Sequence, residues 1–401
     1  MLDLPGDCWG EICGAIGVFG TARDLRRVNR ALARLGAAWL RGGDGAHRLF
    51  CAGIAFQLGL RGRALNDKLG RRMVEAAAAN GDPCADAYCD LEGWGVGRLA
   101  PDWRRAVRTL EAASSSTTSS CAWSEFLVGY CKYHGYGYSR ADQSASVRWY
   151  QAAADAGLCV AQNHLALMHM EGEGNLTKNI SLARRLLEQA AAQGNCRARY
   201  GLAMHDYTAF VRGIEDGIED PKDDPECNEY ADGPLFNNVK DAGQILSLFT
   251  MSAQQGHDEA QYQLALFYEM GPEKSRLPLP LDTHEAVKWI KLAAERGPAE
   301  STDWYGLATY TLGRFHEQGV GPLSPGNKCD ALEWYLRAAK VGSTEALYSV
   351  GGYCLYGYAE LDADPARAAS FFQRAARQGH AQAATDLGVL IELGIHPIDD
   401  A

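Results

Sequence analysis

One phrase of sixteen residues recurs along the chain and limits what the chain can fold into. At seven places an Asp or Asn is followed fifteen residues later by a Gly, and a large apolar residue stands eight positions before that Gly. The pairs are Asn66/Gly81, Asp142/Gly157, Asn179/Gly194, Asp241/Gly256, Asp282/Gly297, Asn327/Gly342 and Asp364/Gly379. Such a recurrence indicates a repeat protein, in which each unit packs only on its neighbours.

The copy from Asp282 to Gly297 predicts one complete helix. Asp282 is a typical N-cap residue, and Glu285 stands three positions later as a capping-box partner. Val287 and Ile290 lie at helical spacing on one apolar face. Gly297 ends the helix, because glycine adopts the left-handed conformation without steric cost. The aromatic residues eight positions before the Gly of their copies are expected in the core: Trp149, Trp289, Trp334 and Phe371.

Composition narrows the class of partner. The chain has 401 residues, is 47% hydrophobic and 22% charged, and carries a net charge of −11. This charge argues against a nucleic-acid partner, because such proteins need clustered Lys and Arg. No run approaches the ~20 apolar residues of a membrane span, and the first residues are acidic where a signal peptide is basic. We therefore expect an intracellular protein, cytoplasmic or nuclear, with no membrane contact.

The twelve cysteines and ten histidines show no recognisable metal motif. Cys84, Cys121, Cys159 and Cys196 are 37, 38 and 37 residues apart and share roughly one repeat phase. We interpret them as small, buried, reduced thiols. No CxxC pair or H-E-x-x-H motif is present, so the sequence predicts no metal and no cofactor.

Residues 2–40 differ from the rest of the chain. A Leu-Pro start precedes a short apolar helix, and an Asp-Leu pair then leads into Arg-x-Val-x-Arg-x-Leu-x-x-Leu. This pattern resembles an F-box, so residues 1–40 are expected to form an F-box-like helical module. The resemblance implies binding to the Skp adaptor of a cullin–RING ubiquitin ligase. The matching positions are Leu4, Pro5, Trp9, Ile12, Leu25 and Val28. The alternative is an N-terminal helical cap on the repeats.

From about residue 46 to the C-terminus, the helices preceding the capped phrase share a second pattern. A lead Ala is followed four and five residues later by Leu and a small residue, as in Leu165-Ala166 and Leu312-Gly313. These helices end in G-x-G, as in Gly172-Glu-Gly174. The units resemble Sel-one-like repeats of the tetratricopeptide-like family. This resemblance implies an all-α fold, a right-handed α/α solenoid of about eight helix-pair repeats over residues 46–401.

One unit carries an acidic insertion at about residues 208–238. Its carboxylate density predicts a solvated loop, because few apolar groups are available to bury. A calcium site is the alternative, although the D-x-[DN]-x-[DN]-G frame is absent.

The first helix of each unit is expected to present one face to a partner. Residues at −1, +2, +6 and +9 from the lead Ala point away from the second helix. In tetratricopeptide-like arrays this face lines the concave groove, and the resemblance implies the same here. The residues are Trp123, Phe126, Tyr130, Tyr133, Asn163, Tyr200, Tyr207, Tyr262, Tyr310, Arg314 and Tyr348. A tyrosine-rich face suits recognition of a protein or peptide. The alternative is that these tyrosines pack between neighbouring first helices.

These patterns favour an interaction protein over an enzyme. The glycine pairs follow helices, so they predict tight turns and no phosphate loop, and no G-x-S-x-G elbow appears. The leading hypothesis is a substrate-recruiting adaptor of a ubiquitin ligase, with the repeats holding the target. The alternatives are a scaffold or assembly factor and, as a third class, an enzyme with a site between repeats.

Overall fold

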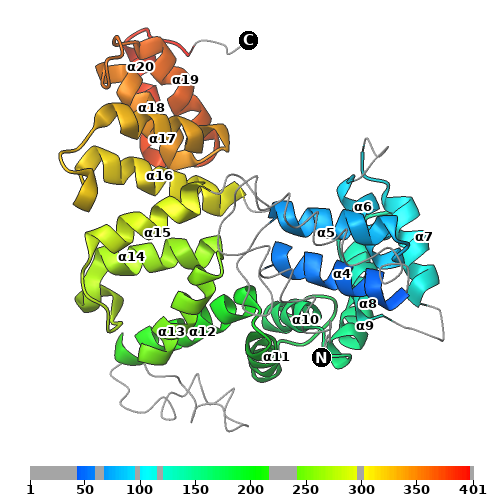
Figure 1. The fold of residues 1–401 in the computed structure, drawn as a ribbon. Coiled ribbons are helices and arrows are strands. Elements are labelled where there is room, and N and C mark those ends of the chain that lie inside the picture. The colour runs from blue at the N-terminus through cyan, green and yellow to red at the C-terminus, as the bar shows by residue number, and fades with distance from the viewer. Residues whose placement is uncertain are drawn as a thin grey trace. The chain divides into compact units, whose positions relative to one another are not determined.

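The computed structural model describes residues 43–58, 67–94, 100–114, 121–215, 242–295 and 302–397, and all regular structure there is helical (Figure 1). The first half contains α4 (Gly43–Gln57), α5 (Asp67–Ala79), α6 (Pro83–Glu92), α7 (Trp103–Ser114), α8 (Ala122–His134), α9 (Gln143–Asp155), α10 (Cys159–Glu171), α11 (Ile180–Ala192) and α12 (Cys196–Glu215). The second half contains α13 (Ala242–Gln254), α14 (Asp258–Ser275), α15 (Thr283–Glu295), α16 (Thr302–Gln318), the 3-10 turn η4 (Gly321–Leu323), α17 (Lys328–Lys340), α18 (Thr344–Tyr356), α19 (Pro365–Arg377) and α20 (Ala381–Glu392).

Consecutive helices pack as pairs, which confirms the all-α repeat fold. The pairs are α4 with α5, α6 with α7, α8 with α9, α10 with α11, α14 with α15, α16 with α17, and α18 with α19. The rings of Tyr207 and Phe249 join α12 to α13 as an eighth pair, and α20 packs on α19 as a single closing helix. The chain divides into one compact unit of residues 1–205 and 213–239, and a second of residues 206–212 and 240–401.

The second helices begin and end as the repeated phrase predicts. The side chains of five predicted caps each accept a first-turn backbone N–H: Asp142, Asn179, Asp282, Asn327 and Asp364. Six of the predicted terminal glycines have φ between 84° and 93°: Gly81, Gly157, Gly194, Gly256, Gly342 and Gly379. The prediction of one cap–glycine phrase per repeat is therefore confirmed at these positions; Asn66, Asp241 and Gly297 lie outside the described residues.

The capping box expected at Asp282 does not form. The backbone N–H of Asp282 donates instead to the carbonyl of Tyr268 at the end of the preceding helix (3.1 Å). Glu285 pairs with Lys288 one turn later (2.9 Å). The prediction was wrong because the cap's own N–H closes the loop between the two helices. Asn327 makes the equivalent bond to His316.

The position of the core anchor differs from the prediction by one residue. Trp289 is buried, but Trp149, Trp334 and Phe371 are only half-buried. The fully buried ring is the next residue along: Tyr150, Tyr335 and Phe372. Successive residues of a helix are rotated by 100° about its axis. The predicted aromatic ring therefore lies at the edge of the core, and the ring of the next residue lies inside it.

The second glycine of the G-x-G turn is needed for contact between repeats. A Cβ on Gly174 would lie 2.8 Å from the carbonyl oxygen of Gln143, the first residue of the preceding second helix. The equivalent Gly321 would meet the carbonyl oxygen of Thr283 at 2.9 Å, again at the start of a second helix. Both glycines also have positive φ. These glycines therefore serve packing between repeats, a role in addition to the tight turn that the sequence predicted.

The two non-repeat regions are described only in small part. Residues 1–40, which hold the F-box-like motif, lie outside the described residues. The acidic insertion, expected at about 208–238, begins within α12, which continues to Glu215, and residues 216–241 are not described. In the described part of the chain, no helix combines the length and apolar character needed to cross a membrane.

Candidate functional site

Three of the residues predicted on the partner-binding face lie in the interior. Trp123, Phe126 and Asn163 are only 7%, 5% and 5% exposed. The ring of Trp123 packs edge-on against Phe50 (5.7 Å between centroids), and Phe126 packs against Tyr150 (5.5 Å). The expectation that these side chains face solvent was therefore wrong. Both aromatic residues lie on α8, whose neighbouring helices enclose that side.

The other predicted residues are half-buried: Tyr130, Tyr133, Tyr200, Tyr207, Tyr262, Tyr310, Arg314 and Tyr348. Several rest on aromatic rings of adjacent helices. Tyr262 packs on Trp304 (5.7 Å between centroids), and Tyr310 packs on Tyr335 (5.4 Å). These side chains keep part of their surface in solvent while the rest is held by packing.

Polar bonds join three of these residues to the next or preceding repeat. The hydroxyl of Tyr133 donates to Glu173 (2.6 Å), and that of Tyr348 donates to Asp386 (3.0 Å). Arg314 contacts both carboxylate oxygens of Glu269, each at 2.8 Å. The bond to Glu173 raises the pKa of Tyr133 to about 12, with burial adding to the shift. The alternative of packing between neighbouring first helices is thus supported in part for Tyr262 and Tyr348, whose partners Trp304 and Asp386 lie on the next first helix.

A partly buried polar cluster of the second unit centres on Glu317. Its two carboxylate oxygens each accept a hydrogen bond of 2.8 Å, one from the hydroxyl of Tyr335 and one from that of Tyr353. The three residues lie on α16, α17 and α18, so the carboxylate joins two successive repeats. Burial and these bonds raise the pKa of both phenols.

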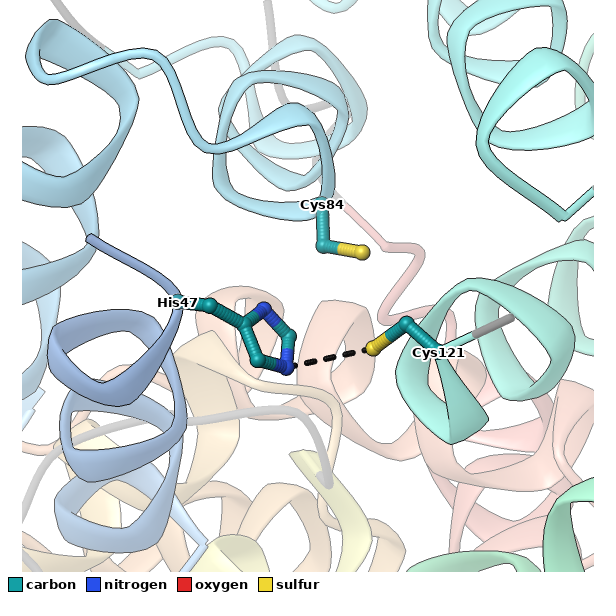
Figure 2. Close-up of side chains that lie close together, drawn as sticks. All are labelled: His47, Cys84 and Cys121. Carbon is teal, nitrogen blue, oxygen red and sulfur yellow. Dashed lines mark hydrogen bonds between the residues drawn. The ribbon is translucent and has the colours of Figure 1, made fainter. Parts of the chain in front are cut away.

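A second polar cluster, which we call the His/Cys cluster, consists of His47, Cys51, Cys84 and Cys121. His47 and Cys51 lie one turn apart on α4, Cys84 lies in the first turn of α6, and Cys121 is the N-cap residue of α8. One donor atom each from His47, Cys84 and Cys121 lie within 4.8 Å of one another. Figure 2 shows these three side chains pointing into one space between their helices.

The imidazole organises this cluster. His47 Nδ1 donates to the carboxylate of Asp82 (2.9 Å), and Nε2 lies 3.2 Å from the Cys121 sulfur and 3.5 Å from the Cys51 sulfur. Burial alone lowers the pKa of His47, but its bonds to Asp82 and the two sulfurs raise it to about 12. Contact with Cys84 and His47 lowers the pKa of Cys121 to about 4, although burial opposes this.

Sequence reasoning missed this cluster, although the sequence contained a signal for it. His47, Cys84 and Cys121 are separated by 37 and 37 residues, one repeat length each. Residues one repeat apart lie side by side in a stacked array. The regular spacing of the cysteines was recognised, but His47 was not included in the series. No short motif marks the group, because its members belong to three different repeats.

The helix pairs place the chain among the helical-repeat proteins, and comparison identifies the repeat. A family model for the Sel1 repeat matches residues 124–158, 159–195, 258–298, 306–343 and 344–380. These five segments are therefore Sel1 repeats.

Two solved structures share this fold. A protective antigen of uropathogenic Escherichia coli with an SLR fold is 22% identical, has a TM-score of 0.50 and aligns over 97% of this chain and 80% of its own. A Sel1 repeat protein from Oxalobacter formigenes is 20% identical, also with a TM-score of 0.50, over 72% of this chain and 96% of its own. At these sequence identities, the similarity to the two structures shows a shared fold and nothing about function.

Two curated relatives are regulators of chitin synthase by name. Chitin synthase regulatory factor 3 of Schizosaccharomyces pombe is 29% identical over 242 residues, which is 56% of this chain and 24% of the relative. Chitin synthase regulator SKT5 of Malassezia restricta is 29% identical over 197 residues, 48% of this chain and 11% of the relative. The matched region therefore spans a quarter or less of these relatives' length.

Proposed function

We propose that the chain is a non-catalytic adaptor whose repeats bind a protein or peptide partner. The observation that carries this proposal is the set of half-buried tyrosines on the first helices, including Tyr133, Tyr262, Tyr310 and Tyr348. Tyrosine is favoured at interfaces because its large ring is apolar while its hydroxyl finds a polar partner. Packing and inter-repeat bonds already fix several of these rings. Binding would therefore sacrifice little side-chain entropy.

The relatives support an adaptor or regulator in preference to an enzyme. The names of these proteins describe regulators of another enzyme, chitin synthase. A net charge of −11 further favours a partner that offers basic side chains.

The test of the repeat surface uses the full chain as bait and compares two aromatic variants. Tyr262→Ala removes a half-buried ring from a first helix, whereas Trp334→Ala removes a half-buried ring from a second helix. Once a partner is captured, titration calorimetry should show binding weakened at least ~10-fold by Tyr262→Ala, as for an interface anchor. Trp334→Ala should leave the affinity within about twofold. Equal effects of the two variants would argue against the first-helix face.

The more specific form of the proposal gives residues 2–40 the role of docking the Skp adaptor. Leu4, Pro5, Trp9, Ile12, Leu25 and Val28 are the residues that match the F-box pattern. The chain would then act by proximity, because holding a target beside the ligase raises its effective concentration. Ubiquitin transfer would be carried out by the other subunits.

A pull-down with recombinant Skp adaptor tests this role. The full chain should retain the adaptor, and Pro5→Ala should weaken retention, since Pro5 begins the first helix of the motif. If the adaptor is not retained, a scaffold or assembly factor whose N-terminal helices only cap the array remains. The names of the relatives favour that second candidate, because they describe regulators and mention no ligase.

A further inference from the structure

The His/Cys cluster has the donor atoms and spacing of a metal site. A tetrahedral zinc ion, with bonds of ~2.3 Å to sulfur and ~2.0 Å to nitrogen, places its ligand atoms roughly 3.5–3.8 Å apart. The Nε2 atom of His47 lies 3.2 Å from the Cys121 sulfur and 3.5 Å from the Cys51 sulfur. The donor atoms of His47, Cys84 and Cys121 are all within 4.8 Å of one another. Small side-chain shifts would bring the donors of His47, Cys84 and Cys121 to ligand spacing, and Cys51 already lies beside the imidazole.

We propose that His47, Cys84 and Cys121, with Cys51 as the fourth donor, bind a single divalent metal ion of the zinc class. Thiolate and imidazole ligands together select zinc over the oxygen-preferring magnesium and calcium. Three sulfurs and one nitrogen complete the four-coordinate set that is typical of structural zinc sites.

Asp82 supplies the outer support that a histidine ligand requires. Its side chain is buried, and its Oδ2 accepts from His47 Nδ1 at 2.9 Å. Its Oδ1 accepts from the backbone N–H of Ala85 at 2.7 Å, which fixes the carboxylate at the N-cap of α6. The imidazole is thereby oriented with Nε2 toward the sulfurs. Histidine ligands commonly donate their second nitrogen to a carboxylate in this way.

The fourth donor follows from helix geometry. Cys51 is four residues after His47 on α4, so both side chains lie on the same face of that helix. The other two sulfurs come from α6 and α8 of the next two repeats. A bound ion would therefore tie three successive first helices together. Its removal should loosen the N-terminal repeats without altering the tyrosine face of the second unit.

Two other chemistries use the same atoms and must be separated from metal binding. Cys121, His47 and Asp82 are also arranged as a thiol nucleophile, its base and the orienting carboxylate. Alternatively, Cys84 and Cys121 could form a disulfide, with loss of two protons and two electrons to an added oxidant. Neither of these uses Cys51, whereas four-coordinate binding does.

The decisive experiment titrates the reduced, metal-free full chain with Co²⁺ and then with Zn²⁺. We expect one equivalent of Co²⁺ to produce thiolate-to-metal charge-transfer absorption and the visible bands of a tetrahedral site, and Zn²⁺ to abolish both. Cys84→Ser and Cys121→Ser should lose this spectrum. Cys159→Ser is the matched control, because Cys159 begins α10 in the same repeat phase but is not among the residues of the cluster.

A milder variant guards against loss of folding. Asp82→Asn keeps the oxygen that caps α6 but removes the anionic partner of His47, so it should weaken Zn²⁺ binding ~10–100-fold with unchanged helical circular dichroism. Cys51→Ser should lower the charge-transfer intensity in proportion to the thiolate lost. Absence of a Co²⁺ spectrum in the fully reduced chain would overturn the proposal. So would an unchanged spectrum in Cys84→Ser, or alkylation of Cys121 at the same rate with and without Zn²⁺.

Discussion

The His/Cys cluster and the Glu317 cluster use the same repeat geometry for different ends. Each joins polar side chains from three helices of successive repeats. At Glu317 both carboxylate oxygens accept a hydrogen bond from a phenol, so the arrangement is complete without a further ligand. At His47 the surrounding groups are thiols, which are weak hydrogen-bond partners and strong metal ligands. The repeat geometry therefore determines which side chains lie close together. The chemistry of those side chains determines whether they satisfy one another by hydrogen bonds or can bind a metal ion.

The starts of the first helices show the same contrast. In the first unit a cysteine lies within the first two residues of α6, α10 and α12, and another is the N-cap residue of α8. In the second unit α14, α16, α18 and α20 begin with Asp, Thr, Thr and Ala. At this position the sulfurs of Cys84 and Cys121, which lie one repeat apart, come within 4.8 Å of each other. Among the described residues, the cluster of candidate metal ligands lies in the first unit, and soft-metal binding is expected there.

The largest expected effect comes from removing the central ring of the Glu317 cluster. Tyr335 is 1% exposed and donates to Glu317, so Tyr335→Ala should destabilise the protein by about 3–5 kcal/mol through loss of packing. Urea unfolding followed by circular dichroism measures this change. Tyr356→Ala is the control, because that ring is 65% exposed and its loss should change stability by less than about 0.5 kcal/mol.

Substitution of two equivalent glycines tests how tightly the two helices of a pair are packed in each unit. A Cβ on Gly313 would lie 2.7 Å from the ring of Tyr335, whereas one on Gly129 would lie 3.0 Å from the ring of Tyr150. Gly313→Ala should therefore cost about 1–3 kcal/mol through overpacking, and Gly129→Ala should cost less.

The control for these substitutions is Gly352→Ala. This glycine is also helical, but an added Cβ meets no atom within 4 Å. Here the higher helix propensity of alanine should stabilise the protein by up to ~1 kcal/mol. Thermal unfolding of the three variants ranks them. Equal shifts in melting temperature for all three variants would show that contact with a tyrosine ring does not limit residue size at Gly313 and Gly129.

Substitution of one polar group in each cluster should change metal-free stability in opposite directions. Glu317→Gln replaces an acceptor of two phenol bonds and should cost about 1–2 kcal/mol. Cys121 occupies the N-cap of α8 without a side-chain capping bond, and serine is a strong N-cap residue. Cys121→Ser should thus be neutral or stabilising by up to about 1 kcal/mol in chelator. A loss of several kcal/mol in chelator would mean that the thiols stabilise the fold by themselves.

Local patterns predicted the fold well because each repeat marks its own helix ends. The caps at Asp142 and Asn327 and the left-handed Gly157 and Gly342 depend on neighbouring residues in the chain alone. The core anchor was predicted one residue too early, since apolar spacing does not tell which of two adjacent aromatic residues, such as Trp149 and Tyr150, faces the first helix.

The candidate sites were less accessible to sequence reasoning because they depend on contacts between repeats. A face drawn from helical periodicity placed Trp123 at the surface, but Phe50 from an earlier repeat covers it. Arg314 was recognised as part of the face, while its pairing with Glu269, 45 residues earlier, could not be read from either helix alone. The His/Cys cluster required the 37-residue period to be applied across residue types, from histidine to cysteine.

The smallest expected effect is a dependence on alkaline pH that belongs to the Glu317 cluster. Burial, with the bond to Glu317, raises the pKa of Tyr353 above the ordinary phenol value of 10.0. The folded state therefore holds this proton more tightly than the unfolded state, so the stabilisation is fully present below pH ~10 and is lost as the pH rises above it. Tyr353→Phe should lower stability by about 1 kcal/mol at neutral pH and make the decline above pH ~10 shallower. Melting temperatures measured between neutral and strongly alkaline pH test this difference, with Tyr356→Phe as the exposed control. An identical decline in melting temperature for Tyr353→Phe and wild type would show that the Tyr353 phenol ionises alike in the folded and unfolded chain. The hydrogen bond to Glu317 would then not stabilise the protonated phenol.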